Sequence, residues 1–391
     1  MSHIVSYLKR QKENTFFDMP FNEVDALVLS QFIYLKLDGL IPTTSEKKEA
    51  VYLYEIANNL DYEKVFIDER YRKNNTELFE AMVESKRFRR MKMNYFSDIT
   101  SVLAETQFSA MTVFLEGGPN VVIYRGTDET MVGWKEDFNM IFKEPVTGQS
   151  LSAMYLQQVS EQLEGDFIVT GHSKGGNFAI YASMNIEDKI QDRIERVYSF
   201  DSPGFRPEIL ESVDFNKIKD RIIKYLPHSS IFGMLLQSKE NYQIVECFSI
   251  GVLQHNPYNW QISGNEFKKV DKLGRSSVFL NETYNEWLYG LSDEELQAYS
   301  EIWYKVMQDA NITTMLQFTK EPGKALISLI DAIKETDDKT KEMAKDLAHG
   351  LIEVAKENIR YYAKKYIKVR GKKEEIEDKQ ESVNIEESMR S

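Results

Sequence analysis

A short segment of this sequence combines an apolar run, a glycine-rich turn and a helical pattern, and the turn contains a serine. Residues 167–170 (F-I-V-T) are typical of a buried strand, and G-H-S-K-G follows at once at 171–175. Residues 176–182 favour a helix. A G-x-S-x-G pattern between a strand and a helix is typical of a nucleophile elbow, where small neighbours permit the strained turn that exposes the serine hydroxyl. The segment therefore predicts Ser173 as a catalytic nucleophile.

Strand patterns alternate with helical patterns on both sides of this segment. Residues 108–115 and 121–124 read as two strands joined by a glycine-containing turn, which predicts an antiparallel hairpin. Further strands are expected at residues 197–200, 222–226 and 242–248. Strands that alternate with helices indicate an α/β fold with a mainly parallel central sheet.

The pattern divides the 391 residues into four regions. Residues 1–105 read mainly as helices packed on the core, and residues 106–290 hold the α/β pattern. Residues 291–373 read as a charged helical extension, and residues 374–391 are polar and expected to be disordered. An apolar stripe at 344–369 predicts that the extension packs on the core or on a protein partner, and the cations near its end leave peripheral contact with acidic lipid open.

Composition excludes several classes of protein. A net charge of −13 argues against a broad nucleic-acid surface. The single cysteine, Cys247, excludes an internal disulfide, and the five histidines are too scattered to indicate a metal site. No secretory signal and no run of about 18 apolar residues is found, so we expect a cytoplasmic protein without a membrane span. No cofactor is expected.

The base and the acid that a serine nucleophile requires must come from loops that follow other strands. In α/β-hydrolases the chain order is serine, acid, histidine, and this order excludes His3. His172 is fixed beside the serine, and His349 lies in the helical extension. His228 and His255 remain, each after a predicted strand, and we favour His255 because it follows the last one.

Three further site residues follow from position along the strands. Asp201 ends the strand after the elbow helix, so we expect it at the same sheet edge as the serine. The backbone amides of Thr127, which follows a predicted strand and a glycine, and of Lys174 are expected to form an oxyanion hole. The side chain of Lys174 is expected to face solvent, and residues 138–155 are the segment in which a lid is to be sought.

Several motifs in fixed order resemble those of known lipases. Y-R-G-T at 124–127, Trp134 with Asp137, and the elbow G-H-S-K-G-G are similar to the F-R-G-T, W-x-x-D and G-H-S-L-G-G motifs of class 3 lipases. The sequence resembles more closely a bacterial family of uncharacterised lipase-like hydrolases, over about residues 15–290. The motifs shared with that family are G-H-S-K-G-G-N, D-x-P-G, P-x-x-S-x-x-G-M-L-L and Q-H-x-P-Y-x-W.

This resemblance implies the α/β-hydrolase fold, with Ser173 as nucleophile, His255 as base and a lipid or acyl-glycerol ester as substrate. One motif departs from the pattern. Class 3 lipases place the acid in a D-x-V-P segment, whereas residues 225–230 here read Y-L-P-H-S-S, so Asp201 would be a relocated acid.

The combined interpretation is a serine acyl-ester hydrolase that works through an acyl-enzyme intermediate. A thioesterase, an amidase or an acyltransferase would use the same three residues. An alternative from another class is an inactive hydrolase scaffold that binds a protein partner or a membrane surface through its helical ends.

Overall fold

The computed structural model describes residues 2–68, 71–128, 130–236, 241–249 and 251–310, with single positions between 327 and 349. Apart from such single positions, the expected extension beyond residue 310 and its apolar stripe at 344–369 lie outside the described residues, as does the whole tail at 374–391.

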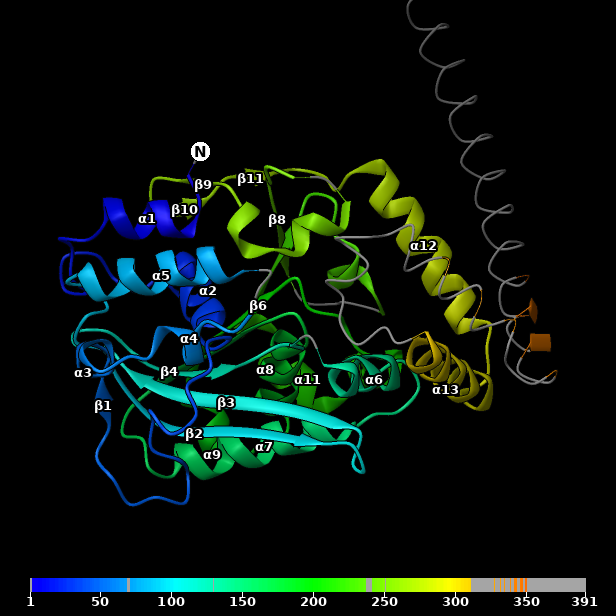
Figure 1. Ribbon diagram of the computed structural model, residues 1–391, viewed down its shortest axis with the longest axis horizontal. Helices are drawn as coiled ribbons and strands as arrows, with labels where there is room; N and C mark the ends of the chain where they lie inside the picture. The colour runs from blue at the N-terminus through cyan, green and yellow to red at the C-terminus, as the bar shows by residue number, and fades with distance from the viewer. Residues whose placement is uncertain are drawn as a thin grey trace, which may run out of the picture.

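The described strands form a nine-stranded sheet with a parallel centre and antiparallel flanks (Figure 1). Its centre consists of β4 (Asn120–Tyr124), β5 (Phe167–His172), β6 (Ile194–Phe200), β7 (Ile222–Pro227) and β8 (Tyr242–Val245), which are parallel neighbours in chain order. Its flanks are β1 (Val51–Tyr52), β2 (Lys92–Ser101) and β3 (Thr106–Phe114) on one side and β11 (Lys269–Val270) on the other. The α/β class is confirmed, and the predicted hairpin is β3 and β4. β2, β3 and β4 are antiparallel because short turns join them, and such turns can join only antiparallel strands.

Helices cover both faces of the sheet, and the strands alternate between two hydrophobic cores. Val121 and Ile123 of β4 face the core formed with the N-terminal helices, whereas Val122 and Tyr124 face the core formed with the connecting helices. The first group is α1 (Ile4–Arg10), α2 (Glu23–Phe32) and α5 (Arg72–Glu84), and the second includes α7 (Thr147–Ser160), α8 (Lys174–Met184) and α11 (Val213–Ile218). Shorter elements are α3 (Leu53–Asn58), α4 (Tyr62–Val65), α9 (Asp188–Gln191), α10 (Pro207–Leu210), and the β9 (Ile262–Ser263) and β10 (Glu266–Phe267) ribbon. None of the described helices is both long and apolar enough to cross a bilayer.

The helical interpretation of residues 1–105 is wrong at its end, because β2 belongs to the central sheet. β2 pairs with β3 from Lys92 to Ser101, with an irregularity between Asn94 and Ser97. Its second half is half-buried or exposed and carries mostly polar side chains. A polar strand with an interrupted alternation gives no period-2 signal, which is why the sequence pattern misses it.

The segment expected to hold a lid is divided between a loop and a core helix. Residues 147–155 lie in α7, where Gly148, Gln149, Ser152 and Tyr155 are buried. The Tyr155 hydroxyl donates to the Tyr95 carbonyl (2.8 Å). These core contacts exclude residues 147–155 as a lid, because a lid must be able to leave the core.

The last two helices before residue 310 pack on elements beside the sheet edge. Helix α12 (Arg275–Tyr289) holds the loop after β7: Asn281 Nδ2 donates to the Ser230 carbonyl (3.0 Å), and Asn285 Nδ2 donates to the Met234 carbonyl (2.9 Å). Helix α13 (Asp293–Asp309) packs on α6 (Met131–Asn139), and Figure 1 shows both at the same end of the molecule. The indole rings of Trp134 and Trp303 stack between these two helices, with centroids 6.1 Å apart. Residues 293–309 of the expected extension form helix α13.

Candidate active site

The carboxyl ends of β4, β5 and β6 lie side by side at one edge of the sheet. The parallel register brings the last residues of these three strands into adjacent positions. The loops that follow therefore start together, and they carry Thr127, Ser173 and Asp201. Ligands of open α/β sheets bind at this kind of edge.

Ser173 lies in a strained turn between β5 and α8. Its φ and ψ are 57° and −134°, a conformation that residues other than glycine rarely adopt. A Cβ on Gly175 would lie 2.2 Å from the Tyr124 carbonyl oxygen, so only glycine fits there. Lys174 is the first residue of α8, and its backbone N–H therefore has no acceptor within the helix. The predicted order of strand, sharp turn and helix is present.

Asp201 and His255 are hydrogen-bonded at the same edge. His255, at the end of the 3-10 helix Gly251–His255, places its Nδ1 2.6 Å from Asp201 Oδ2. Asp201 is buried, and its Oδ1 accepts from Ser230 Oγ (2.5 Å) and from the Gly233 amide (3.1 Å). Its φ of 45° is again unusual for a residue that is not glycine. The carboxylate is therefore held by three donors if Nδ1 carries the proton.

His172 fixes the backbone of His255. The Nε2 of His172 lies 2.9 Å from the His255 carbonyl oxygen, and it must donate because a carbonyl only accepts. The two imidazole rings are 4.6 Å apart. The Tyr34 hydroxyl lies 3.3 Å from the other ring nitrogen of His172. This residue thus holds a neighbour in place, a role that the sequence pattern did not indicate.

His228, the other histidine that the sequence left open as a base, contacts Ser229 and Gly274. Its Nδ1 is 3.2 Å from Ser229 Oγ, and its ring lies beside Gly274. The carboxylate of Asp201 is hydrogen-bonded to His255 instead. The geometry therefore favours His255 over His228.

The loop that carries Thr127 touches the serine turn. A Cβ on Gly126 would lie 3.0 Å from Ser173 Cβ, so the two backbones meet closely at this glycine. Thr127 Oγ1 donates to Asp137 Oδ2 (2.6 Å), which ties the loop to α6. The W-x-x-D motif thus supplies a carboxylate that holds the threonine.

The expectation that the Lys174 side chain faces solvent is wrong. The side chain is fully buried, and its Nζ donates to Glu136 Oε2 (2.8 Å) and lies 3.4 Å from the Gly133 carbonyl. Helix α6 lies against this side of the turn and supplies the carboxylate. The sequence did not point to Glu136, because its neighbours in the chain do not distinguish it from a surface glutamate. The available signal was Lys174 itself, a lysine among the small and apolar residues that begin α8, which requires a buried partner.

Ionisation of Asp137 lowers the stability of the folded protein at neutral pH. Burial raises the pKa of Asp137 to about 6, although the Lys174 ammonium and the Thr127 hydroxyl oppose this shift. Because the folded pKa exceeds that of the unfolded chain, the stability present below about pH 4 is lost as pH rises through 6.

We expect Asp137→Asn to raise the free energy of unfolding by about 2 kcal/mol at pH 7.5, discounted for partial exposure, and to leave it unchanged at pH 4. Urea unfolding at both pH values measures this; equal effects at both would contradict it.

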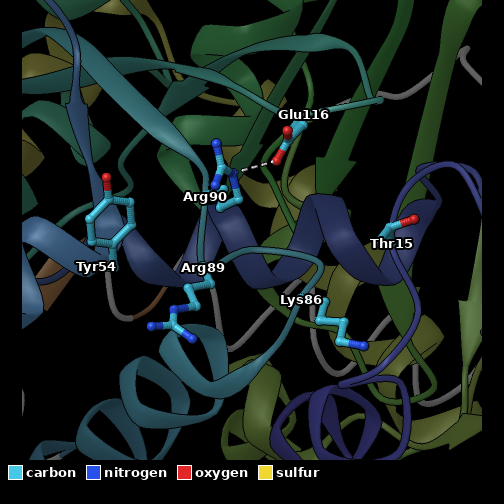
Figure 2. Close-up of a pocket in the computed structure, with 6 residues that line it drawn as sticks. All are labelled: Thr15, Tyr54, Lys86, Arg89, Arg90 and Glu116. Atoms are coloured by element: carbon cyan, nitrogen blue, oxygen red, sulfur yellow. Dashed lines mark ion pairs between the residues drawn. The ribbon is translucent and has the colours of Figure 1, made fainter.

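A separate cavity lies near the opposite edge of the sheet, because Glu116 belongs to the turn that precedes β4 (Figure 2). Its volume is about 430 Å³, and it is lined by Thr15, Tyr54, Lys86, Arg89, Arg90 and Glu116. The Arg90 guanidinium pairs with Glu116 (2.7 Å), and Lys86 pairs with Glu13 (2.9 Å). The side chains of Lys86 and Arg89 turn in different directions in Figure 2, so the cations do not converge on one point. This cavity is not part of the candidate active site.

Within the described ranges, no group of three or more His, Cys, Asp or Glu side chains is arranged to hold a metal ion.

A comparison with curated proteins finds no match. Among solved structures, the crystal structure of M37 lipase is similar over 55% of this chain and 70% of that chain, with 15% sequence identity and a TM-score of 0.34. A family model described as Mbeg1-like matches residues 82–305, which is more than half of the chain and includes every residue of the candidate site. The chain therefore belongs to the Mbeg1-like family.

Proposed function

We propose that this protein is a serine acyl-ester hydrolase in which Ser173, His255 and Asp201 form the catalytic triad. The observation that carries the proposal is the 2.6 Å hydrogen bond between His255 Nδ1 and the buried Asp201 carboxylate. It lies at the sheet edge where Ser173 occupies a strained turn. A buried carboxylate bonded to an imidazole, at the same sheet edge as a half-buried serine in a strained turn, is the arrangement that acyl transfer requires.

The chemistry follows from this arrangement. Ser173 Oγ attacks the ester carbonyl carbon while its proton passes to His255 Nε2. The bond from the carbonyl carbon to the leaving alcohol then breaks, and the alcohol takes the proton from Nε2. Water attacks the acyl-serine by the same route in reverse, which releases the acid and restores the serine. No cofactor enters these steps.

Asp201 selects the tautomer that makes His255 a base. A carboxylate that accepts from Nδ1–H leaves the lone pair on Nε2, where the serine proton must go. The bonds from Ser230 and the Gly233 amide hold the carboxylate in this orientation.

The amides of Lys174 and Thr127 would bind the oxyanion. The Lys174 N–H begins α8, where the helix dipole favours negative charge. Thr127 lies in the loop that touches the serine turn at Gly126. Removal of one donor of this kind costs about 10²–10³ in rate.

Lipid or acyl-glycerol esters are the substrate class that we propose, since the sequence motifs resemble those of lipases. The ring of Phe232 lies 4.4 Å from the His255 ring, so the base has an apolar neighbour suited to an acyl chain. Thioesters and amides are alternatives that the same triad can cleave, and relative kcat/KM values on matched substrates decide between them.

Labelling with a fluorophosphonate tests the proposal without knowledge of the substrate. The activated serine displaces fluoride from phosphorus, so only a working nucleophile and base give fast labelling. We expect wild type to be labelled on Ser173, and His255→Ala to be labelled at least about 10³-fold more slowly. His228→Ala is the matched control and should be labelled like wild type. Absence of labelling in buffer and in detergent micelles would overturn the proposal and favour the inactive scaffold.

A further inference from the structure

The ion pair between Lys174 and Glu136 is fully buried beside the candidate nucleophile. The exposed fractions of the two side chains are 0% and 1%. Besides Lys174, Glu136 accepts from Thr106 Oγ1 (2.5 Å), from the Gln107 amide (3.0 Å) and from the Gly148 amide (2.8 Å). One carboxylate therefore joins the start of β3, the start of α7 and the serine turn.

This pair connects the two backbone segments that carry the oxyanion amides. Lys174 supplies one amide itself, and its side chain reaches α6 through Glu136 and the Gly133 carbonyl. Helix α6 in turn holds the other segment. Gly133 packs so closely on Thr127 that a Cβ there would lie 2.7 Å from the threonine methyl carbon, and Asp137 accepts from the Thr127 hydroxyl.

We infer that the Lys174–Glu136 pair positions the Thr127 and Lys174 amides relative to each other and to Ser173, and so sets the rate of acyl transfer. This inference rests on the proposed function. Both charges are desolvated, and a buried ion pair of this kind often adds little to stability compared with apolar residues. It does fix distance and direction, and misplacement of catalytic groups by about 1 Å can cost about 10²-fold in rate.

Lys174 acts as a positioning residue and not as the base. Its ammonium donates to a carboxylate and a carbonyl on α6. A protonated amine has no lone pair with which to accept the serine proton, whereas His255 offers Nε2. The Nζ of Lys174 lies over the ring of Phe178, 5.6 Å from the ring centroid, and against the Glu136 carboxylate.

The test compares Lys174→Met with the double variant Lys174→Met/Glu136→Gln. The single variant leaves Glu136 charged without a counter-ion, so it should be less stable; the double variant removes both charges and should regain most of the wild-type melting temperature. We expect both to be labelled by a fluorophosphonate about 10- to 100-fold more slowly than wild type. On a short p-nitrophenyl ester, kcat should fall by the same factor while KM stays within about twofold.

A second buried ion pair offers a matched control. Arg87 and Asp25 are both fully buried, and Arg87 also donates to the carbonyls of Thr15, Met19 and Pro20. Arg87→Met should lower the melting temperature but leave the labelling rate of the folded protein unchanged. A double variant at Lys174 and Glu136 that labels at the wild-type rate would overturn the inference. Failure to label wild type would instead overturn the proposed function itself.

Discussion

Replacement of Ser173 by alanine is expected to lower kcat/KM for ester hydrolysis by at least about 10⁴-fold. Ser173 is the proposed nucleophile, so without its hydroxyl only binding and the oxyanion amides would remain. Alanine keeps a Cβ, so the strain of the turn at φ 57° is unchanged and the fold should be retained. Hydrolysis of p-nitrophenyl esters of graded acyl length measures the effect and gives the chain-length preference of wild type.

Ser183→Ala is the matched control for this variant. Ser183 lies near the end of α8, the helix that begins directly after Ser173, and it is buried. Its hydroxyl donates a hydrogen bond to the Ala179 carbonyl (2.7 Å), away from the sheet edge. Its replacement should leave kcat/KM within about twofold. Ester hydrolysis that survives in Ser173→Ala would show that another nucleophile acts, and the triad would have to be abandoned.

Replacement of Asp201 by asparagine is expected to lower kcat by about 10⁴-fold with little change in KM. An asparagine keeps the size of the side chain and can still accept from Ser230 and the Gly233 amide. Its amide nitrogen, however, would donate to His255 Nδ1, and the ring proton would move to Nε2. The imidazole would then have no lone pair facing the serine.

The pH dependence of this variant separates a tautomer effect from loss of structure. If the tautomer is wrong, kcat should stay low from pH 6 to 9 while the melting temperature remains close to that of wild type. Asp214→Asn is the control, because Asp214 lies in α11 and pairs with Lys217 (3.6 Å). A loss of less than about tenfold in Asp201→Asn would contradict its role as the triad acid.

The parts of the site that depend on the sheet edge could be predicted from the sequence. A residue that directly follows a parallel strand must emerge at the carboxyl edge, and this alone places Ser173 and Asp201 together. His255 follows no such rule, since it ends a 3-10 helix beyond the last parallel strand. Chain order allowed both it and His228, the choice depended on its place after the last predicted strand, and only the contact with Asp201 gives a physical reason for it.

The parts that depend on side-chain contacts between distant segments could not be predicted. The burial of Lys174 results from the way α6 lies against the serine turn, and no local pattern encodes that approach. The polar strand β2 was missed for a similar reason, because its pairing with β3 outweighs its weak local preference. In both cases tertiary contacts decide what the residue or segment does.

Helix α13 makes the folded unit longer than its motifs suggest. A chain ending at residue 290 would keep every motif and every proposed catalytic residue, yet it would lack α13, which covers Trp134 and Phe138 of α6. An exposed pair of aromatic rings favours aggregation, and the helix that carries Glu136 and Asp137 would lose its outer support. Preparations of this protein for enzymology should therefore extend past residue 309, so that an inactive fragment is not mistaken for an inactive enzyme.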